Sequence, residues 1–216
     1  YAGAAGVWQF MPRTSAAFMP RRTKYIDYRN NPIISTLAAL HLLKQNKQIL
    51  KRWDLAVPAY NFGTSHLVKA RRKFKEKATL SYIMENYKHA NVGFASKNYY
   101  SEFLAMVYTL AYKDLIFPLK GYLKETNSFK NDIGVYLTKC KVRPKTFFNL
   151  LKKSSPKIDR LNAHFIYKNP TYKRNKIVVS DLQLTDRKYR KLSDKELRSY
   201  YPKNFYKLNR RQKCKN

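Results

Sequence analysis

The chain is poor in acidic residues. Its 216 residues contain 13 Asp and Glu against 45 Lys and Arg, which gives a formal net charge of +32. This imbalance calls for a polyanionic partner or surface, and nucleic acid, anionic lipid and anionic cell-wall polymer all satisfy it. A composition this rich in Lys, Tyr and Phe is also typical of a biased source, so the charge alone does not choose among these partners.

Cysteine and histidine are scarce, which argues against several kinds of site. The two cysteines, Cys140 and Cys214, lie 74 positions apart and form no CxxC pair, so neither a metal knuckle nor a redox pair is indicated. A disulfide between them is not expected, because Cys214 stands in a charged terminal segment. Four histidines are scattered without paired spacing and no glycine-rich phosphate loop is present, so we expect no metal and no cofactor: His41, His66, His89 and His164.

Long hydrophobic runs are also missing. The longest, "FLAMVYTLAY" at 103–112, is half of the roughly 20 residues that a bilayer-spanning helix needs. It predicts a core helix instead. The overall 44% hydrophobic content is sufficient for a packed core, and no signal peptide is visible in a chain that begins at Tyr1.

The first half of the chain has helical patterns. Asn31 and Pro32 stand where a cap and a first helical residue are expected, and a second helix is predicted from about Asp54, broken near Gly63, with a new helix from about Ser65. Two further apolar stripes at helical spacing predict helices that face the core: Leu80, Ile83, Met84 and Tyr87, then Tyr99, Phe103, Met106, Val107 and Leu110.

Composition and predicted secondary structure divide the chain into three parts. Residues 1–116 predict an all-helical domain, so the fold class is mainly α. Residues 120–180 form a small α+β segment, with strands predicted in "IGVYLTKCKV" and "NKIVVS" and a helix in "RPKTFFNLL" between them. Residues 181–216 carry 12 basic and 4 acidic residues with few aliphatic ones, which predicts a basic, poorly packed or disordered tail.

Two motifs carry a family resemblance. "GAAGVWQFMPRTS" at 3–15 and "AYNFG" at 59–63 stand in the order found in the soluble lytic transglycosylases, which cleave peptidoglycan and have a goose-lysozyme-like fold. The chain resembles that family through two matched motifs, which makes the resemblance specific. The matching positions are Gly6, Val7, Trp8, Gln9, Phe10, Met11, Pro12 and Thr14, then residues 59–63.

Within the family, the chain is most similar to the branch of membrane-bound lytic murein transglycosylases. The tryptophan in the first motif, "RNNPIISTLAALHLL" and "RWDLAVPAYN" carry this similarity, which covers about 1–116. A downstream block appears as "ASKNYYSEF", in which Ala95 replaces an acid and Tyr100 a valine. That branch often continues into LysM modules, so residues 120–180 are interpreted either as a degenerate LysM-like module or as an extension that packs on the first domain.

The resemblance implies a site for peptidoglycan glycan strands. It places Gln9 near the muramoyl residue, Tyr60 and Asn61 beside the catalytic acid, and Tyr99 at the far wall of the cleft. A glutamine both donates and accepts hydrogen bonds, which suits an N-acetyl group, and aromatic rings supply apolar faces for sugars. Core packing is the alternative for Trp8 and Phe10, and we favour it for Phe10. The predicted substrate-binding set is Gly6, Trp8, Gln9, Phe10, Met11, Tyr60, Asn61 and Tyr99.

The resemblance also implies a catalytic acid that we do not find. In the family one glutamate acts as general acid and then as base, and the muramoyl C6 hydroxyl closes a 1,6-anhydro ring without water. This glutamate is expected upstream of Tyr1, and no acid of the chain is assigned in its place. Asp27 and Asp54 are interpreted as capping or surface residues. We expect a piece of a longer enzyme that does not cleave glycan by itself, the alternative being a degenerate homologue that only binds peptidoglycan.

A nucleic-acid-binding protein is the alternative from another class. The basic runs "KARRKFKEK" and "NRRQKCKN" favour it, but no base-reading motif accompanies them and a basic run is usually a solvated face. We therefore expect no nucleic-acid partner. The resemblance implies a location in the bacterial cell envelope, periplasmic or associated with the outer membrane, where anionic surfaces are available to the positive charge.

Overall fold

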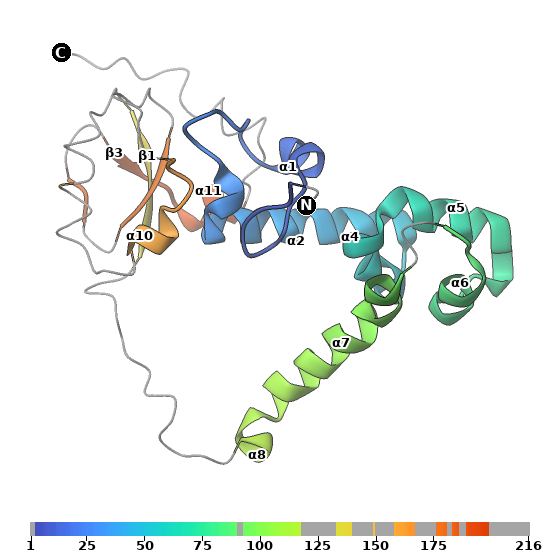
Figure 1. Ribbon diagram of the computed structural model, residues 1–216. Coiled ribbons are helices and arrows are strands. Elements are labelled where there is room, and N and C mark those ends of the chain that lie inside the picture. The colour runs from blue at the N-terminus through green and yellow to red at the C-terminus, as the bar shows by residue number, and fades with distance from the viewer. Residues whose placement is uncertain are drawn as a thin grey trace. The chain divides into compact units, whose positions relative to one another are not determined.

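Helices dominate the structure, a computed structural model that describes residues 3–89, 93–117, 133–139, 149, 158–166, 176–180, 183–185 and 189–198. The predicted mainly α fold, with a small antiparallel sheet, is confirmed (Figure 1). Contacts divide the chain into unit 1, Tyr1–Ala39 with Thr126–Asn216, and unit 2, Leu40–Glu125. Each unit is described by itself below.

Prolines open two helices of unit 1. Pro12 opens α1 (Pro12–Phe18), and α2 (Pro32–Leu50) begins at the expected proline. The side-chain Oδ1 of Asn31 accepts a hydrogen bond from the Ile34 amide at 2.9 Å, which satisfies one of the free amides at the start of α2. A short 3-10 helix, η1 (Tyr28–Asn30), lies between α1 and α2.

Unit 1 also contains a three-stranded antiparallel sheet of order β2-β1-β3, formed by β1 (Gly134–Thr138), β2 (Ile177–Ser180) and β3 (Tyr189–Lys191). All residues of β1 and β2 are buried, which is typical of short strands with continuous apolar runs. Both predicted strands are confirmed. The predicted helix "RPKTFFNLL" lies outside the described residues, apart from Asn149.

Side chains cap the outer edge of β2, as strand edges require if they are not to pair with other chains. Asn162 donates to the carbonyl of Val179 at 2.7 Å and accepts from its amide at 2.9 Å. The Ile177 amide donates to the hydroxyl of Tyr28 at 3.2 Å, and its carbonyl lies 2.9 Å from Nε2 of His164. The Tyr28 bond attaches the sheet to the N-terminal segment, and a backbone bridge between Ile26 and Phe165 joins that segment to the residues around His164.

This packing differs from the predicted division of the chain. The expected boundary between 116 and 120 separates the mixed segment from the first domain, whereas residues 25–31 pack with 158–166 and 176–180 in one unit. The predicted tail from residue 181 is also wrong for 189–198, which form β3 and α11 (Asp194–Arg198). The tail has few aliphatic residues, but Tyr189 and Leu192 are buried beside β1, and the Leu192 amide donates to the Val135 carbonyl at 2.8 Å.

His164 is a fully buried histidine whose partners fix its protonation. The Ile177 carbonyl only accepts hydrogen bonds, so Nε2 of His164 carries the proton. Nδ1 lies 3.0 Å from the amide nitrogen of Asn31, which only donates, so Nδ1 is an acceptor. Asn31 cannot turn its amide without loss, because the same nitrogen donates to the Leu161 carbonyl at 2.9 Å. Burial lowers the pKa of His164 from 6.5 to about 3, although the bond to Ile177 opposes the shift.

We therefore expect unit 1 to lose stability in weak acid. The unfolded chain takes up a proton on His164 near pH 6.5, whereas the folded chain does not until about pH 3. Stability from this group is full above pH 6.5 and falls as the pH drops toward 3, by about 2 kcal/mol between pH 7 and pH 5. Urea unfolding of the native chain and of His164→Gln at both pH values measures it, and equal pH dependence in the two proteins would contradict the assignment.

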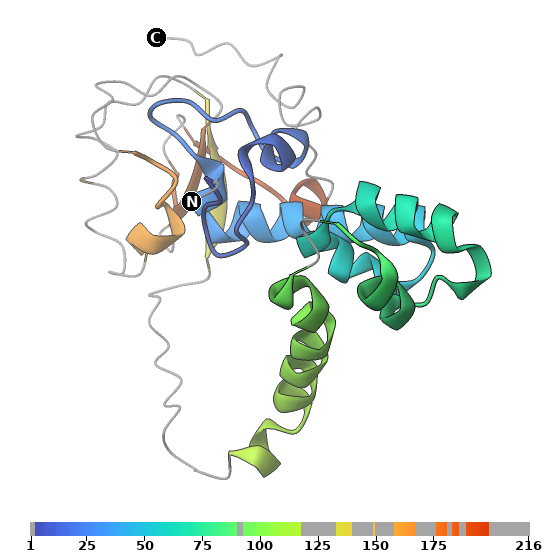
Figure 2. The ribbon, with the colours of Figure 1, turned by 45° about the vertical axis from the view of Figure 1, so that its right-hand side comes forward.

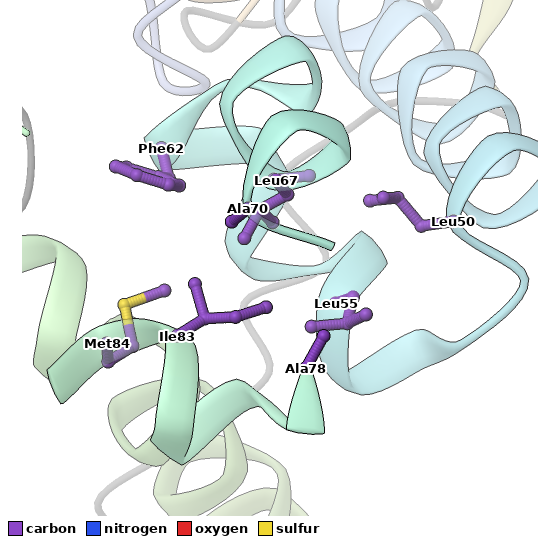
Figure 3. Close-up of a cluster of buried hydrophobic side chains, with 9 residues drawn as sticks. Leu50, Leu55, Phe62, Leu67, Ala70, Ala78, Ile83 and Met84 are labelled. Atoms are coloured by element: carbon purple, nitrogen blue, oxygen red, sulfur yellow. The ribbon is translucent and has the colours of Figure 1, made fainter. Parts of the chain in front are cut away.

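Unit 2 contains several short helices around one apolar cluster, together with the longer helix α7. The elements are α3 (Trp53–Ala56), α4 (Pro58–Phe62), α5 (Thr64–Phe74), the 3-10 helix η2 (Lys75–Lys77), α6 (Leu80–Asn86), α7 (Phe94–Ala111) and α8 (Lys113–Ile116). The cluster contains Leu50, Leu55, Ala59, Phe62, Leu67, Ala70, Ala78, Ile83 and Met84 (Figure 3). The predicted core stripe of 80–87 is confirmed, with Ile83 and Met84 inside and Leu80 and Tyr87 partly buried against them.

The helix predicted from about Asp54 is two helices. Pro58 has no amide hydrogen to continue α3, and it starts α4 in the position where proline is favoured. The break at Gly63 is confirmed, and α5 then begins at Thr64, one residue before the predicted start.

The core role predicted for α7 is wrong. Its apolar residues are largely exposed, and in both ribbon views α7 runs out from the α4–α6 group of the same unit (Figures 1 and 2). Ser96 is its buried residue among those described. The exposed apolar side chains of 103–112 are Phe103, Leu104, Met106, Val107, Tyr108, Leu110 and Tyr112.

Across the described residues, no helix combines the length and the apolar character needed to traverse a bilayer.

Candidate functional site

The first motif folds into a tight loop in unit 1. Ala5 and Phe10 form an antiparallel bridge with backbone bonds of 3.2 and 3.3 Å, so the four residues between them make a closed turn. Gly6 enters the turn with φ +74°, and Gln9 leaves it with φ +48°. Glycine suits the first conformation because an L side chain rarely adopts it. The glycine-rich start of the motif thus has a structural reason.

Gln9 is held in a costly conformation. A positive φ at a residue other than glycine costs on the order of 1–3 kcal/mol and is often found at functional sites. The Gln9 amide and side-chain Nε2 both donate to the carbonyl of Gly6, at 3.1 and 2.8 Å. These two bonds fix the side chain at the solvent-exposed rim of the loop and leave its carboxamide oxygen available to accept a bond.

The other predicted residues of the first motif divide between the surface and the interior. Trp8 is half-buried, and its indole nitrogen donates to Thr36 of α2 at 2.7 Å, which anchors the loop to the helix. Phe10 is 2% exposed and belongs to the core, which is the interpretation that the sequence favours for it. Phe10 is therefore removed from the candidate binding set. Met11 is 40% exposed and immediately precedes α1.

A buried ion pair that the sequence did not predict holds this loop. The Arg29 guanidinium binds the Asp27 carboxylate through Nε at 2.9 Å and Nη2 at 2.7 Å, and its Nη1 donates to the carbonyls of Gly3 at 2.6 Å and Phe10 at 2.9 Å. Burial alone would raise the pKa of Asp27, but the bonds from Arg29 outweigh it and hold the pKa below its ordinary value. Asp27 also caps η1, as predicted, but it is buried rather than exposed.

The second motif, "AYNFG", and the downstream block "ASKNYYSEF" meet in unit 2. The Ser96 hydroxyl on α7 donates to the Oδ1 of Asn61 on α4 at 3.1 Å, across 35 positions of sequence. Burial raises the pKa of the Tyr60 hydroxyl well above its ordinary value, and the neighbouring Tyr99 adds to the rise; burial likewise raises the pKa of Tyr99. "AYNFG" and "ASKNYYSEF" therefore bring two neutral tyrosine hydroxyls and an amide to one place.

Asn46 of α2 positions this part of the site. It is fully buried, donates to the carbonyl of Ala56 at 3.2 Å and accepts from the Thr64 hydroxyl at 2.6 Å. These bonds connect α2 to both sides of α4. Gly63, with φ +94°, then lets the chain turn directly from α4 into α5. No hydrophobic pattern indicates Asn46, because a buried polar side chain looks in sequence like a surface residue.

The predicted set thus forms two groups. Gly6, Gln9 and Met11 lie with the anchoring Trp8 in unit 1, and Tyr60, Asn61 and Tyr99 lie in unit 2. The structure brings together the residues within each group.

Several described carboxylates lie outside the two groups, either in ion pairs or exposed to solvent. Asp27 is neutralised by Arg29, Asp54 pairs with Arg52 at 2.6 Å on the surface, and Glu196 pairs with Arg190 at 2.7 Å. Glu102 and Glu85 are exposed on their helices. The described part of the chain also contains no group of three metal-ligating side chains. The amide and hydroxyl groups of the two groups, with their aromatic rings, are chemically suited to contact a polar, ring-bearing ligand.

Comparison with known proteins gives a family match for the first part of the chain. Residues 1–83 match the family model of the transglycosylase SLT domain. This match supports the resemblance predicted from the motifs.

Two relatives bear the same name. The chain is 39% identical over 70 residues to membrane-bound lytic murein transglycosylase D of Escherichia coli strain K12, and equally to the protein of that name in E. coli O6:H1. Each match covers 32% of this chain and 16% of the relative. The matched part is therefore a small portion of those enzymes.

Proposed function

We propose that this chain carries the glycan-contacting part of a lytic murein transglycosylase. The whole enzyme would cleave the β-1,4 bond between MurNAc and GlcNAc without water and leave a 1,6-anhydromuramoyl end. The observation that carries the proposal is the meeting of Tyr60 and Asn61 with Ser96 and Tyr99, because these residues come from two motifs that sequence alone connects to a peptidoglycan cleft. The family match over 1–83 supports it.

Each residue has a task that follows from its chemistry. Gln9 offers a carboxamide oxygen to the N–H of an N-acetyl group, and its strained backbone keeps that oxygen in place. Tyr60 and Tyr99 stay protonated at neutral pH, so their hydroxyls both donate and accept bonds to sugar hydroxyls. Ser96 holds Asn61 in orientation through its hydroxyl.

The general acid is proposed to lie ahead of Tyr1. The described acids that make ion pairs are committed to basic partners, and the family resemblance puts its glutamate before the position of Gly6. The chain as printed is accordingly proposed to bind glycan without cleaving it, and the enzyme to work in the bacterial envelope, where its relatives are named as membrane-bound.

Binding to purified, insoluble peptidoglycan tests the contact residues. Tyr60→Phe and Tyr99→Phe each remove one hydroxyl and keep the ring, so we expect binding about 3–10-fold weaker for each, as the loss of one hydrogen bond of about 1 kcal/mol requires. Co-sedimentation with increasing peptidoglycan measures the affinity.

Tyr108→Phe is the matched control. Tyr108 lies on the same helix as Tyr99 and is 63% exposed, so this change is expected to leave binding within about twofold of the native chain, the ordinary effect of a surface change. If all three variants bind like the native chain while remaining folded, α4 and α7 do not form a glycan-contacting surface.

A further inference from the structure

The basic run "KARRKFKEK", 69–77, forms one wall of a pocket in unit 2. Val68, Arg71, Arg72 and Lys75 follow one another at spacings of three, one and three residues, which places them on one face of α5 and the turn after it. The pocket has a volume of about 730 Å³, within the usual range for small-molecule sites. The remaining lining residues are Ile49, Arg52, Glu76 and Ala78.

The charge of this pocket is unbalanced. Four cationic side chains line it against one carboxylate, Glu76. Arg52 is partly neutralised by Asp54, which it binds at 2.6 Å. Arg71 is oriented by a 2.9 Å bond from Nη1 to the Leu50 carbonyl at the end of α2, which leaves its other donors for a ligand.

Arg72 and Lys75 complete the cationic side. Within the described part of the chain neither side chain makes a hydrogen bond or an ion pair, although each could donate several. Lys75 also has φ +50°, at the end of a helix where glycine is the usual residue. A strained backbone at a lysine that lines a cationic pocket favours a role for its charge there.

We propose that this pocket binds a phosphate group carried on a small organic or lipid molecule. A guanidinium group donates two parallel hydrogen bonds to two phosphate oxygens, and a lysine ammonium adds a positive charge on a flexible side chain. Ile49, Val68 and Ala78 give the pocket an apolar side that a bare ion does not need but an organic phosphate does. The site shares no residue with the glycan-contacting set, so it stands independently of the proposed function.

Titration of the full chain with inorganic phosphate, at constant ionic strength set with chloride, tests the proposal. Amide shifts in a ¹⁵N-labelled sample report the binding, and residues of α5 and η2 are expected to shift saturably. Arg72→Gln is expected to weaken the affinity about fivefold or more, as expected for a bond to a charged group. Lys75→Gly removes a charge and relieves the backbone, so it should also weaken binding, yet unfold at no lower temperature than the native chain.

Lys73→Gln is the matched control, because Lys73 lies in the same turn of α5 but does not line the pocket. It loses the same charge and the same interaction with the helix dipole, so it separates a site from a general electrostatic effect. An affinity within twofold of the native chain is expected. Equal weakening by Lys73→Gln and Arg72→Gln, or no saturable shift with phosphate, would overturn the proposal.

Vesicles identify the source of the phosphate. If the ligand is a lipid headgroup, the chain binds phosphatidylglycerol vesicles in a way that Arg72→Gln weakens and Lys73→Gln does not. If it is a soluble phosphate ester, glycerol 3-phosphate binds more tightly than inorganic phosphate and the two variants bind these vesicles equally. Either result supports the phosphate site. The proposal is contradicted if the chain does not bind phosphate and both variants weaken its binding to duplex DNA equally.

Discussion

Gly6→Ala is expected to lower the free energy of unfolding by about 3–5 kcal/mol, which would be an unusually large effect for one methyl group. A Cβ on Gly6 would stand 1.7 Å from the carbonyl oxygen of Arg29, and the residue has φ +74°. The positive φ alone costs about 1–2 kcal/mol for alanine. The remaining loss comes from the clash with the Arg29 carbonyl, because this group is part of the backbone and cannot move aside without displacing η1. Urea unfolding followed by circular dichroism measures the change.

Two other glycines provide graded controls. Gly3 has φ +77°, but its nearest atom to an added Cβ is 3.8 Å away, so Gly3→Ala should cost only about 1–2 kcal/mol for the backbone. Gly93 has φ −105° and nothing within 4 Å of an added Cβ, so Gly93→Ala meets no clash and should lose only the capping preference of glycine over alanine, about 0.5–1 kcal/mol. Equal costs for Gly3 and Gly6 would show that the contact with Arg29 is unimportant.

Arg29→Met is expected to cost about 3–5 kcal/mol, the usual penalty for leaving a buried charge without its partner. The change leaves Asp27 buried and removes the bonds to the carbonyls of Gly3 and Phe10. The first-motif loop would then lose its attachment, so peptidoglycan binding should weaken along with stability. Chemical denaturation and co-sedimentation on the same samples measure both effects.

Arg22→Met is the control for this prediction. Arg22 also contacts the Asp27 carboxylate, at 3.3 Å, but its side chain is 60% exposed, so the loss should be below about 1 kcal/mol. The double change Asp27→Leu with Arg29→Met should recover part of the stability lost in Arg29→Met, because it removes the unpaired charge. A double variant less stable than Arg29→Met would show that the ion pair is not the source of the loss.

The sequence predicted the parts of the fold that local chemistry decides. Asn31 and Pro32 start α2, Gly63 ends α4, and continuous apolar runs form β1 and β2. It failed where distant residues decide. No local signal predicts that the rings of Tyr28 and His164 stack with their centroids 4.8 Å apart, because 136 positions separate the two residues in sequence. Both residues belong to unit 1, across the domain boundary that the sequence predicts.

Helical periodicity was correct for α7 and misleading about its burial. The spacing of Phe103, Met106 and Leu110 indicates one face of a helix, and they do lie on α7, but periodicity does not say what covers that face. Residues with few apolar neighbours in sequence, such as Tyr189 and Leu192, are buried instead, because β3 pairs with β1.

The candidate site was predictable through motifs rather than through physics. The family resemblance nominated Gln9, Tyr60 and Tyr99 as candidates, whereas Arg29, Ser96 and Asn46 make bonds that only the folded chain shows. Phe10 illustrates the limit of a motif, since its match suggested a sugar contact and its burial assigns it to the core.

Digestion of purified peptidoglycan, with mass spectrometry of the soluble products, tests the central claim most directly. The chain as printed is predicted to bind the polymer and release nothing, while the chain extended by its own upstream coding sequence is predicted to release muropeptides with 1,6-anhydromuramoyl ends, lighter by one water than hydrolysed ones. Anhydro products from the chain as printed would contradict the placement of the acid, and no product from the extended chain would leave only a peptidoglycan-binding homologue.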